Sequence, residues 1–143
     1  MAFLSSLNIS GSALTAQKFR MDVISSNIAN ASTTRTEDGG PYIKKSVVFE
    51  EQDNSFNSIF NSLENGASSG VKVSEVLEDT DAVKKVYDPD NPDADANGYV
   101  LTPDINTVEE MTDMMSATRS YQANVTVFNA VKLMATAALE IGR

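Results

Sequence analysis

Histidine, cysteine and tryptophan are absent from this chain of 143 residues. Without histidine the commonest general acid–base group is missing, and without cysteine there are no thiol nucleophiles and no disulfides. The usual zinc ligands are missing for the same reason. These absences exclude the familiar nucleophilic triads, and we predict a protein that is not an enzyme and that holds no cofactor or metal.

Other catalytic patterns are also missing. The carboxylate pairs Glu50/Glu51 and Glu109/Glu110 are adjacent in the sequence, so their side chains do not converge on a helix or a strand. The seven glycines form no phosphate-binding loop. These patterns favour a binding or structural role over catalysis.

Long apolar runs are missing as well, and none is long enough to span a bilayer. The opening sequence MAFLSSLNISGS lacks the basic region and compact apolar core of a cleaved signal peptide. We therefore expect that, if the protein leaves the cytoplasm, it does so by another route.

The formal net charge of −9 is unevenly placed. Residues 31–104 contain 15 of the 20 acidic side chains but only 6 of the 11 basic ones. An acidic middle argues against nucleic-acid binding, which needs clustered Lys and Arg. It is typical of an exposed surface that stays soluble.

Composition divides the chain into three segments: residues 1–33, 34–104 and 105–143. At 100° per residue, the first segment predicts a helix to about Asn30 with two apolar stripes. The first stripe comprises Phe3, Leu7, Leu14, Met21 and Ile28. The second comprises Ile9, Ala16, Phe19 and Val23. Two stripes indicate a helix covered from two directions, by its own molecule and a neighbour, or else a helix wholly buried in its own domain.

The last segment predicts a helix that runs to about Ile141. Asn106 or Thr107 can cap it, with Glu109 or Glu110 closing a capping box. Its heptad pattern indicates a coiled-coil seam. The seam positions are Met114, Ala117, Tyr121, Asn124, Phe128, Val131, Ala135 and Ala138. Isolated helices of this length are marginal in water, so we expect both terminal helices to depend on partners.

The middle segment predicts strands and loops. Strands are expected at 42–50 and from Val71 to Val76, and residues 82–103 read as strand, long polar turn, strand. Within the Asn/Ser-rich stretch 52–69, Phe56, Ile59, Phe60 and Leu63 have the spacing of a short amphipathic helix. That helix is either a contact surface or a lid on a small β core.

Residues 93–98 read DADANG, which matches the opening of a calcium-binding loop that would span 93–104. The twelfth position is Asp104 where such loops carry Glu, and Pro92 and Pro103 disfavour the flanking helices. The same composition is typical of a turn between strands, the interpretation we favour. A stand-alone interaction module with a calcium loop remains the alternative function.

The stretch SSNIANASTTRT resembles the S-x-N-I-A-N-x-x-T motif of flagellar axial proteins, the rod and hook family. The matching residues are Ser26, Asn27, Ile28, Ala29, Asn30 and Thr33. The stretches GGPYIKKSVVFE, VYDPDNPDADANGYVLTPDIN, RSYQAN and LEIGR extend the similarity over nearly the whole chain, most closely to the short proximal-rod members. Residues 52–69 depart from the family, because this stretch is longer and richer in Asn and Ser.

The resemblance implies an α+β structural subunit of the basal-body rod in the periplasm. Its terminal helices would pack as an antiparallel, coiled-coil-like inner layer around the export channel. It would pass through the flagellar type III export apparatus without a cleaved signal. Its partners would be other copies, related rod proteins and the protein that joins the rod to the membrane (MS) ring. The residues expected to pack these helices are Leu7, Leu14, Met21, Ile28, Met114, Tyr121, Asn124, Phe128 and Val131.

Overall fold

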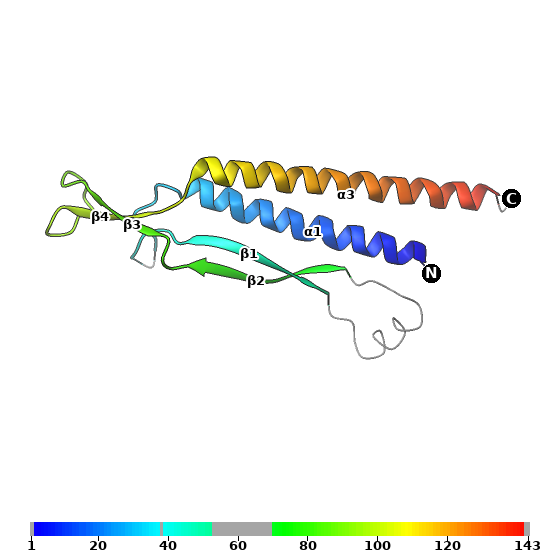
Figure 1. Cartoon of the computed structure of the whole chain (residues 1–143), viewed down its shortest axis with the longest axis horizontal. Coiled ribbons are helices and arrows are strands. Elements are labelled where there is room, and N and C mark those ends of the chain that lie inside the picture. The colour runs from blue at the N-terminus through cyan, green and yellow to red at the C-terminus, as the bar shows by residue number, and fades with distance from the viewer. Residues whose placement is uncertain (1, 38, 53–69, 142–143) are drawn as a thin grey trace. The chain divides into compact units, whose positions relative to one another are not determined.

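The computed structural model describes residues 2–37, 39–52 and 70–141. Within these residues, two long helices near the two ends of the chain flank four strands in the sequence, in the order α1, β1, β2, β3, β4, α3 (Figure 1). The predicted α+β class is confirmed. The short helix predicted around Phe56–Leu63 lies outside the described residues.

The chain forms two compact units. The first comprises residues 1–19, 48–75 and 117–143, and the second comprises residues 20–47 and 76–116. The long helices and the first two strands each contribute to both units. The second unit contains 14 of the 20 acidic residues and 6 of the 11 basic ones. The negative charge of the chain therefore belongs almost entirely to the second unit.

Helix α1 spans Ala2–Ala29, close to the predicted length. It ends in tight turns, in which the amide of Asn30 donates to the carbonyl of Ser26 and the amide of Thr33 donates to that of Asn30. Asp22 and Ser25 are exposed, so the alternative of a helix wholly buried in its own domain is not supported. The helix has partly covered apolar residues and a solvent-facing side.

Helix α3 spans Thr107–Ile141. Asn106 caps it, because its Oδ1 accepts a hydrogen bond of 3.1 Å from the amide of Val108. Glu109 and Glu110 lie in the first turn, where negative charge is favourable to the helix dipole. Among the described residues, neither long helix contains a stretch apolar enough to cross a membrane.

The strands form two separate two-stranded sheets. Strand β1 (Lys44–Glu51) pairs with β2 (Val71–Asp79). Strand β3 (Val83–Tyr87) pairs antiparallel with β4 (Tyr99–Pro103), with Val83 opposite Pro103 and Tyr87 opposite Tyr99. The predicted strand–turn–strand arrangement is confirmed. Strand β1 begins two residues later than predicted, because the amide of Tyr42 donates to the carbonyl of Thr33 instead.

The core of the first unit is made of small side chains. Ser10, Ala16, Ala117 and Val131 are its buried residues among those described. The hydroxyl of Ser12 accepts a hydrogen bond of 3.0 Å from the amide of Val71 and donates to the carbonyl of Ile9. This contact ties the start of β2 to α1 without a large apolar side chain.

The core of the second unit mixes apolar and polar side chains. Its buried apolar members are Ile24, Tyr42, Val100, Pro103 and Ile105, and Asn27 and Glu110 are buried beside them. A buried amide and a buried carboxylate are costly unless they are hydrogen-bonded. The partners of these two groups therefore decide whether the unit is stable.

We predict that a substitution at Gly98, in the turn between β3 and β4, destabilises the folded chain, because Gly98 has a φ of 77°. A side chain there adopts an unfavourable left-handed conformation, and its Cβ would lie 3.0 Å from the ring of Tyr87. We expect Gly98→Ala to lower the free energy of unfolding by about 1–3 kcal/mol in urea denaturation. Gly40→Ala is the control, because its Cβ would meet nothing within 4 Å and its φ is not positive. Equal effects of the two substitutions would contradict this account of the turn.

Candidate functional site

The residues of the S-x-N-I-A-N motif lie at the carboxyl end of α1, where the chain turns toward β1. Asn27 is the most buried of them, with an exposed fraction of 1%. It lies on the same side of α1 as buried Ile24, one turn earlier. The helix thus presents an amide to the interior of the second unit at its last full turn.

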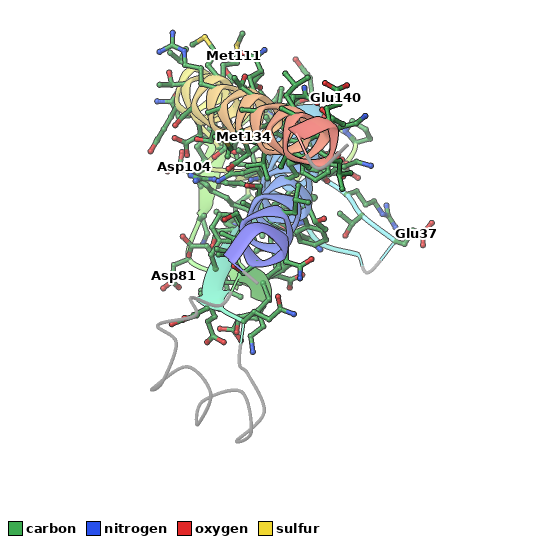
Figure 2. All side chains as sticks on the ribbon, turned by 90° about the vertical axis from the view of Figure 1, so that its right-hand side faces the viewer. Glu37, Asp81, Asp104, Met111, Met134 and Glu140 are labelled. Atoms are coloured by element: carbon green, nitrogen blue, oxygen red, sulfur yellow. The ribbon has the colours of Figure 1, made fainter. Side chains whose placement is uncertain are left out.

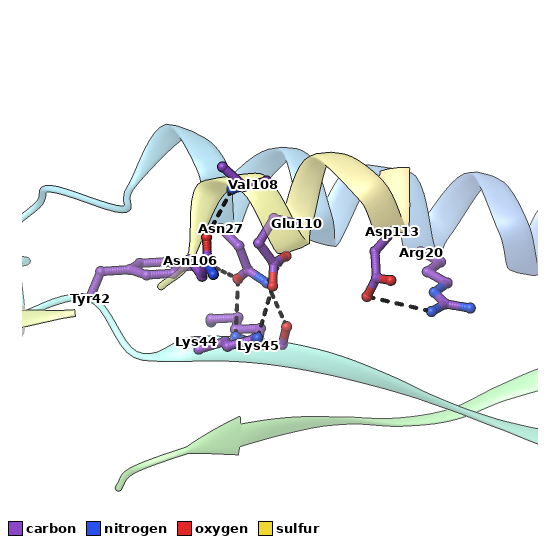
Figure 3. A network of polar contacts seen from close by, with 9 residues as sticks. All are labelled: Arg20, Asn27, Tyr42, Lys44, Lys45, Asn106, Val108, Glu110 and Asp113. Carbon is purple, nitrogen blue, oxygen red and sulfur yellow. Dashed lines mark hydrogen bonds and ion pairs between the residues drawn. The ribbon is translucent and has the colours of Figure 1, made fainter. Parts of the chain in front are cut away.

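All four hydrogen-bonding positions of the Asn27 amide are used (Figure 3). Its Nδ2 donates to the carbonyl of Lys45 at 2.8 Å and to Oε2 of Glu110 at 3.1 Å. Its Oδ1 accepts from the amide of Lys45 at 3.1 Å and from the hydroxyl of Tyr42 at 3.0 Å. One side chain therefore joins α1, the start of β1 and the first turn of α3.

Glu110 is the second buried polar group of this site. Its side chain is 4% exposed, and its Oε1 lies 2.9 Å from Nζ of Lys44. The hydrogen bond to Glu110 raises the pKa of the Lys44 amine above its ordinary value of 10.5, although partial burial opposes the shift. The nearby charges of Glu109 and Asp113 act in the same direction as Glu110. The two carboxylate oxygens of Glu110 thus have different partners, one a cation and the other an amide.

The remaining polar residues of the motif complete the turn after α1. The hydroxyl of Ser26 lies 3.2 Å from that of Tyr42. Nδ2 of Asn30 donates to the carbonyl of Ser26 at 2.9 Å, and Oδ1 of Asn30 accepts from the hydroxyl of Thr33 at 3.2 Å. Ile28 is half-buried and Ala29 is exposed. We call the buried group that Asn27 and Glu110 form with their partners the polar junction. Its members are Asn27, Tyr42, Lys44, Lys45 and Glu110.

Two ion pairs lie at the edge of the polar junction. Lys45 Nζ is 3.0 Å from Oε1 of Glu78, and an Arg20 nitrogen is 3.9 Å from Oδ2 of Asp113. All four side chains are more than one-third exposed, so these pairs add little stability. Because Asn27 meets Glu110 while Arg20, two turns earlier in α1, meets the later Asp113, the helices run antiparallel here.

The arrangement is suited to holding backbone segments together. The amide of Asn27 carries no charge that must be desolvated, and every one of its donors and acceptors has a partner. No hydrogen-bonding position of Asn27 is left for a ligand. A fully satisfied polar network in a core fixes one geometry more strictly than apolar packing does.

The residues predicted to pack helices differ in their burial. Nearly all are half-buried in the single chain, namely Leu7, Leu14, Met21, Ile28, Met114, Tyr121 and Asn124. Val131 is buried and Phe128 is 37% exposed. The amide of Asn124 donates to the carbonyl of Ser120 in its own helix, at 3.0 Å. Their role between subunits stays a prediction.

Sequence reasoning did not identify Tyr42, Lys44, Lys45 or Glu110 as site residues. Glu110 was assigned only to a capping box, whereas its carboxylate binds Lys44 and Asn27. A signal was available, because the heptad seam extended back from Met114 and Ala117 reaches Glu110. An acidic residue at a seam position indicates a buried partner on another element.

The alternative of a calcium loop at 93–104 is not supported. Asp93, its first residue, accepts a hydrogen bond of 2.8 Å from the hydroxyl of Thr34 and lies 3.6 Å from Arg35. Backbone bonds from Gly98 to Asp95 and from Asp95 to Tyr99 form a turn. No group of three or more acidic side chains that could hold a metal occurs in the part of the chain that the structure describes.

Two family models match parts of this chain, and known proteins are similar to it over nearly its whole length. Residues 7–35 match the family model described as flagella basal body rod protein, and residues 96–141 match the flagellar basal body rod FlgEFG protein C-terminal model. The flagellar basal-body rod protein FlgC of Bacillus subtilis is 50% identical over 150 aligned residues, covering all of both chains. FlgC of Escherichia coli O157:H7 is 47% identical over the whole of both chains, and that of Borreliella burgdorferi is 46% identical over 99% of this chain and 98% of its own.

Because Asn27 lies at the centre of the polar junction, we expect Asn27→Ala to lower the stability of the second unit strongly. The substitution removes four hydrogen bonds and leaves Glu110 Oε2 and the hydroxyl of Tyr42 with fewer partners. We expect the free energy of unfolding of the second unit to fall by about 3 kcal/mol, measured by urea denaturation followed by Tyr fluorescence. Asn8→Ala is the matched control, because Asn8 lies on the same helix and is exposed. A loss below about 0.5 kcal/mol would show that the junction does not stabilise the chain.

Because Lys44 forms an ion pair with Glu110, we expect the folded chain to lose stability at alkaline pH. Because the pKa of Lys44 is raised in the folded chain, its contribution is complete below about pH 10.5 and is lost as the pH rises through the raised value. We expect unfolding midpoints in urea to fall between neutral pH and about pH 11.5 more steeply in the parent than in Lys44→Met. The variant should be less stable than the parent at neutral pH, because it leaves Glu110 without its cation. Parallel pH profiles would contradict this role of Lys44.

Proposed function

Because this chain belongs to the FlgC family of flagellar basal-body rod proteins, we propose that it polymerises in the proximal rod through its terminal helices. In this proposal the chain is a structural subunit of the drive shaft that surrounds the export channel. It acts by its shape and contacts, without catalysis and without a cofactor. The observation that carries the proposal is that Asn27 of the axial-family motif lies at the centre of the polar junction.

The polar junction supports a role in transmitting torque. It joins α1, β1 and α3 through groups that are buried and fully hydrogen-bonded. A subunit that transmits torque must keep these elements in one register, and a satisfied polar network resists sliding because every shifted position leaves buried groups unpaired. We infer that the motif sets the geometry of each subunit so that its outer surfaces meet their neighbours.

The outer face of α3 supports the polymerisation step. In the second unit, Val108, Met111 and Met115 are each more than half exposed and share one side of the helix. Met111 lies on the side of α3 turned away from α1 (Figure 2). Single exposed apolar residues are ordinary, but a row of three along a helix indicates a surface that a partner covers.

In the first unit, α3 exposes a further series of large apolar side chains, namely Val127, Leu133, Met134 and Leu139. Between Ser120 and Leu139 the only charged residue is Lys132. Such a helix gains its stability mainly from burial against other helices. We infer that this half of α3 becomes fully ordered when neighbouring subunits cover it.

We propose the following setting for the chain. It lies in the basal-body rod in the periplasm and reaches it through the flagellar type III export apparatus, without a cleaved signal peptide. Its neighbours are other copies, related rod proteins and the protein that joins the rod to the MS ring. The acidic second unit supplies an outward, soluble surface in that setting.

The function is tested by replacing the gene in the bacterium that encodes it with an epitope-tagged copy. We expect the tagged chain to co-purify with detergent-extracted basal bodies and motility to be retained. Deletion of the gene should abolish both the rod and motility. Normal rods in the deletion strain would overturn the proposal.

Phe128→Ala separates assembly from folding. Phe128 is 37% exposed in the single chain, so its loss should cost the isolated chain less than the roughly 3–5 kcal/mol of a fully buried Phe. In the assembled rod the side chain becomes covered, and we expect the variant to be exported but absent from purified basal bodies. Gln122→Ala, at an exposed position of the same helix, is the control and should assemble. Normal assembly of Phe128→Ala would contradict the predicted helix seam.

A further inference from the structure

An aromatic pair stands exposed at the end of the β3–β4 hairpin. The rings of Tyr87 and Tyr99 lie edge to face, with centroids 5.3 Å apart, and these residues are 65% and 45% exposed. We call this pair the tyrosine knob. The turn beyond it projects past the first turn of α3 in the second unit (Figure 1).

The knob is held firmly although it is exposed. Tyr87 and Tyr99 are directly opposite each other in the antiparallel register. The amide of Asp88 donates to the carbonyl of Gly98 at 2.9 Å, and the amide of Asp95 donates to that of Tyr99 at 2.9 Å. Rigid, amphipathic tyrosines supply contact area at low entropic cost, which is why they are enriched at interfaces.

The surroundings of the knob are acidic. Residues 88–95 contain four aspartates and no basic residue. Asp93 is paired with Arg35, whereas Asp88, Asp90 and Asp95 are exposed. Two such tips would repel each other, so a symmetric contact from knob to knob is disfavoured. A surface that complements the tyrosine knob would be an apolar hollow with positively charged side chains near it.

The first unit contains such a hollow, with a volume of about 360 Å³, beside α1. Its apolar lining includes Ala16, Phe19, Val71 and Val73. Phe19 is 41% exposed although it is a large aromatic residue. We call this feature the Phe19 hollow.

One lysine lines the Phe19 hollow, and a second precedes Phe19 in α1. Lys72 is one of its lining residues, and its Nζ lies 3.8 Å from Oε2 of Glu50. Lys18 precedes Phe19 and is exposed. The aspartates beside the tyrosine knob are opposite in charge to Lys72 in the lining and to Lys18 next to Phe19, and both surfaces expose aromatic rings.

We propose that the tyrosine knob of one copy docks into the Phe19 hollow of a second copy. The contact joins two different surfaces of the same chain, so it is heterologous and can propagate from subunit to subunit. The proposal rests on the proposed function, because it names one lateral contact of the polymer. A contact of this size is too small to hold two chains alone and acts together with the helix packing.

The absence of cysteine permits a clean test with single-cysteine chains. Chains carrying Asp90→Cys and Lys18→Cys are mixed in equal amounts at low ionic strength with a mild oxidant, and the disulfide-linked heterodimer is measured by mass spectrometry. Lys132→Cys replaces Lys18→Cys in the control, since Lys132 is an exposed lysine of the same unit outside the hollow. We expect cross-linking to Lys18→Cys to be roughly tenfold faster than to the control.

The knob itself is tested in the Asp90→Cys chain. Adding Tyr87→Ser should reduce the cross-linking rate to that of the control, whereas Tyr87→Phe, which keeps the ring, should retain it. Added salt should slow the reaction, because the attraction is partly ionic. Equal rates for Lys18→Cys and Lys132→Cys, or no effect of Tyr87→Ser, would overturn the proposed contact.

The same variants separate this inference from the proposed function. If the parent chain enters basal bodies but cross-linking is no faster than in the control, the contact is wrong and the rod function stands. If the parent chain does not enter basal bodies, the function itself fails. Preferential Asp90→Cys homodimers would show a symmetric contact and would also overturn the proposal.

Discussion

The buried amide of Asn27 is the constraint on which the second unit depends. Its two donors and two acceptors meet β1, α3 and Tyr42, and no polar atom of this side chain is left without a partner. A charged residue at this position would bring a desolvation cost, and an apolar residue would leave Glu110 with only Lys44. Asparagine alone among small residues supplies the necessary set of donors and acceptors. The turn of the chain after α1 follows from this choice, because Ser26, Asn30 and Thr33 close it around the same point.

This satisfied interior explains how the chain can present adhesive outer surfaces and still keep a defined shape. Polar contacts hold the second unit together, so the apolar rows on α3 are not needed for its internal packing. They stay exposed, as at Met111 and Met115, and are available to neighbours. The negative charge is concentrated in the second unit, where it favours solubility and disfavours wrong pairings between copies.

Much of the fold could be predicted from local patterns. The helices end within a residue or so of their predicted limits, because Asn106 caps the start of α3 and Asn30 and Thr33 close the turn after α1. The β3–β4 turn was visible in its Asp, Asn, Pro and Gly content. The motif could be recognised, but its partners could not. Tyr42, Lys44 and Glu110 are distant in sequence from Asn27, and a single sequence does not reveal which buried polar groups find each other. The helical periodicity of 100° per residue assigns Ile28, and not Asn27, to the packing stripe, although Asn27 is the more buried of the two.

We expect the polar junction to form within one chain, before any contact with a neighbour. Hydrogen exchange at the backbone amide of Lys45 tests it most directly, because this amide donates to Oδ1 of Asn27 at 3.1 Å. In a dilute, monomeric sample we expect the Lys45 amide to exchange as slowly as the core amides of the second unit. Exchange of the Lys45 amide at the rate of an unstructured peptide in the monomer, with protection only after assembly, would contradict the account.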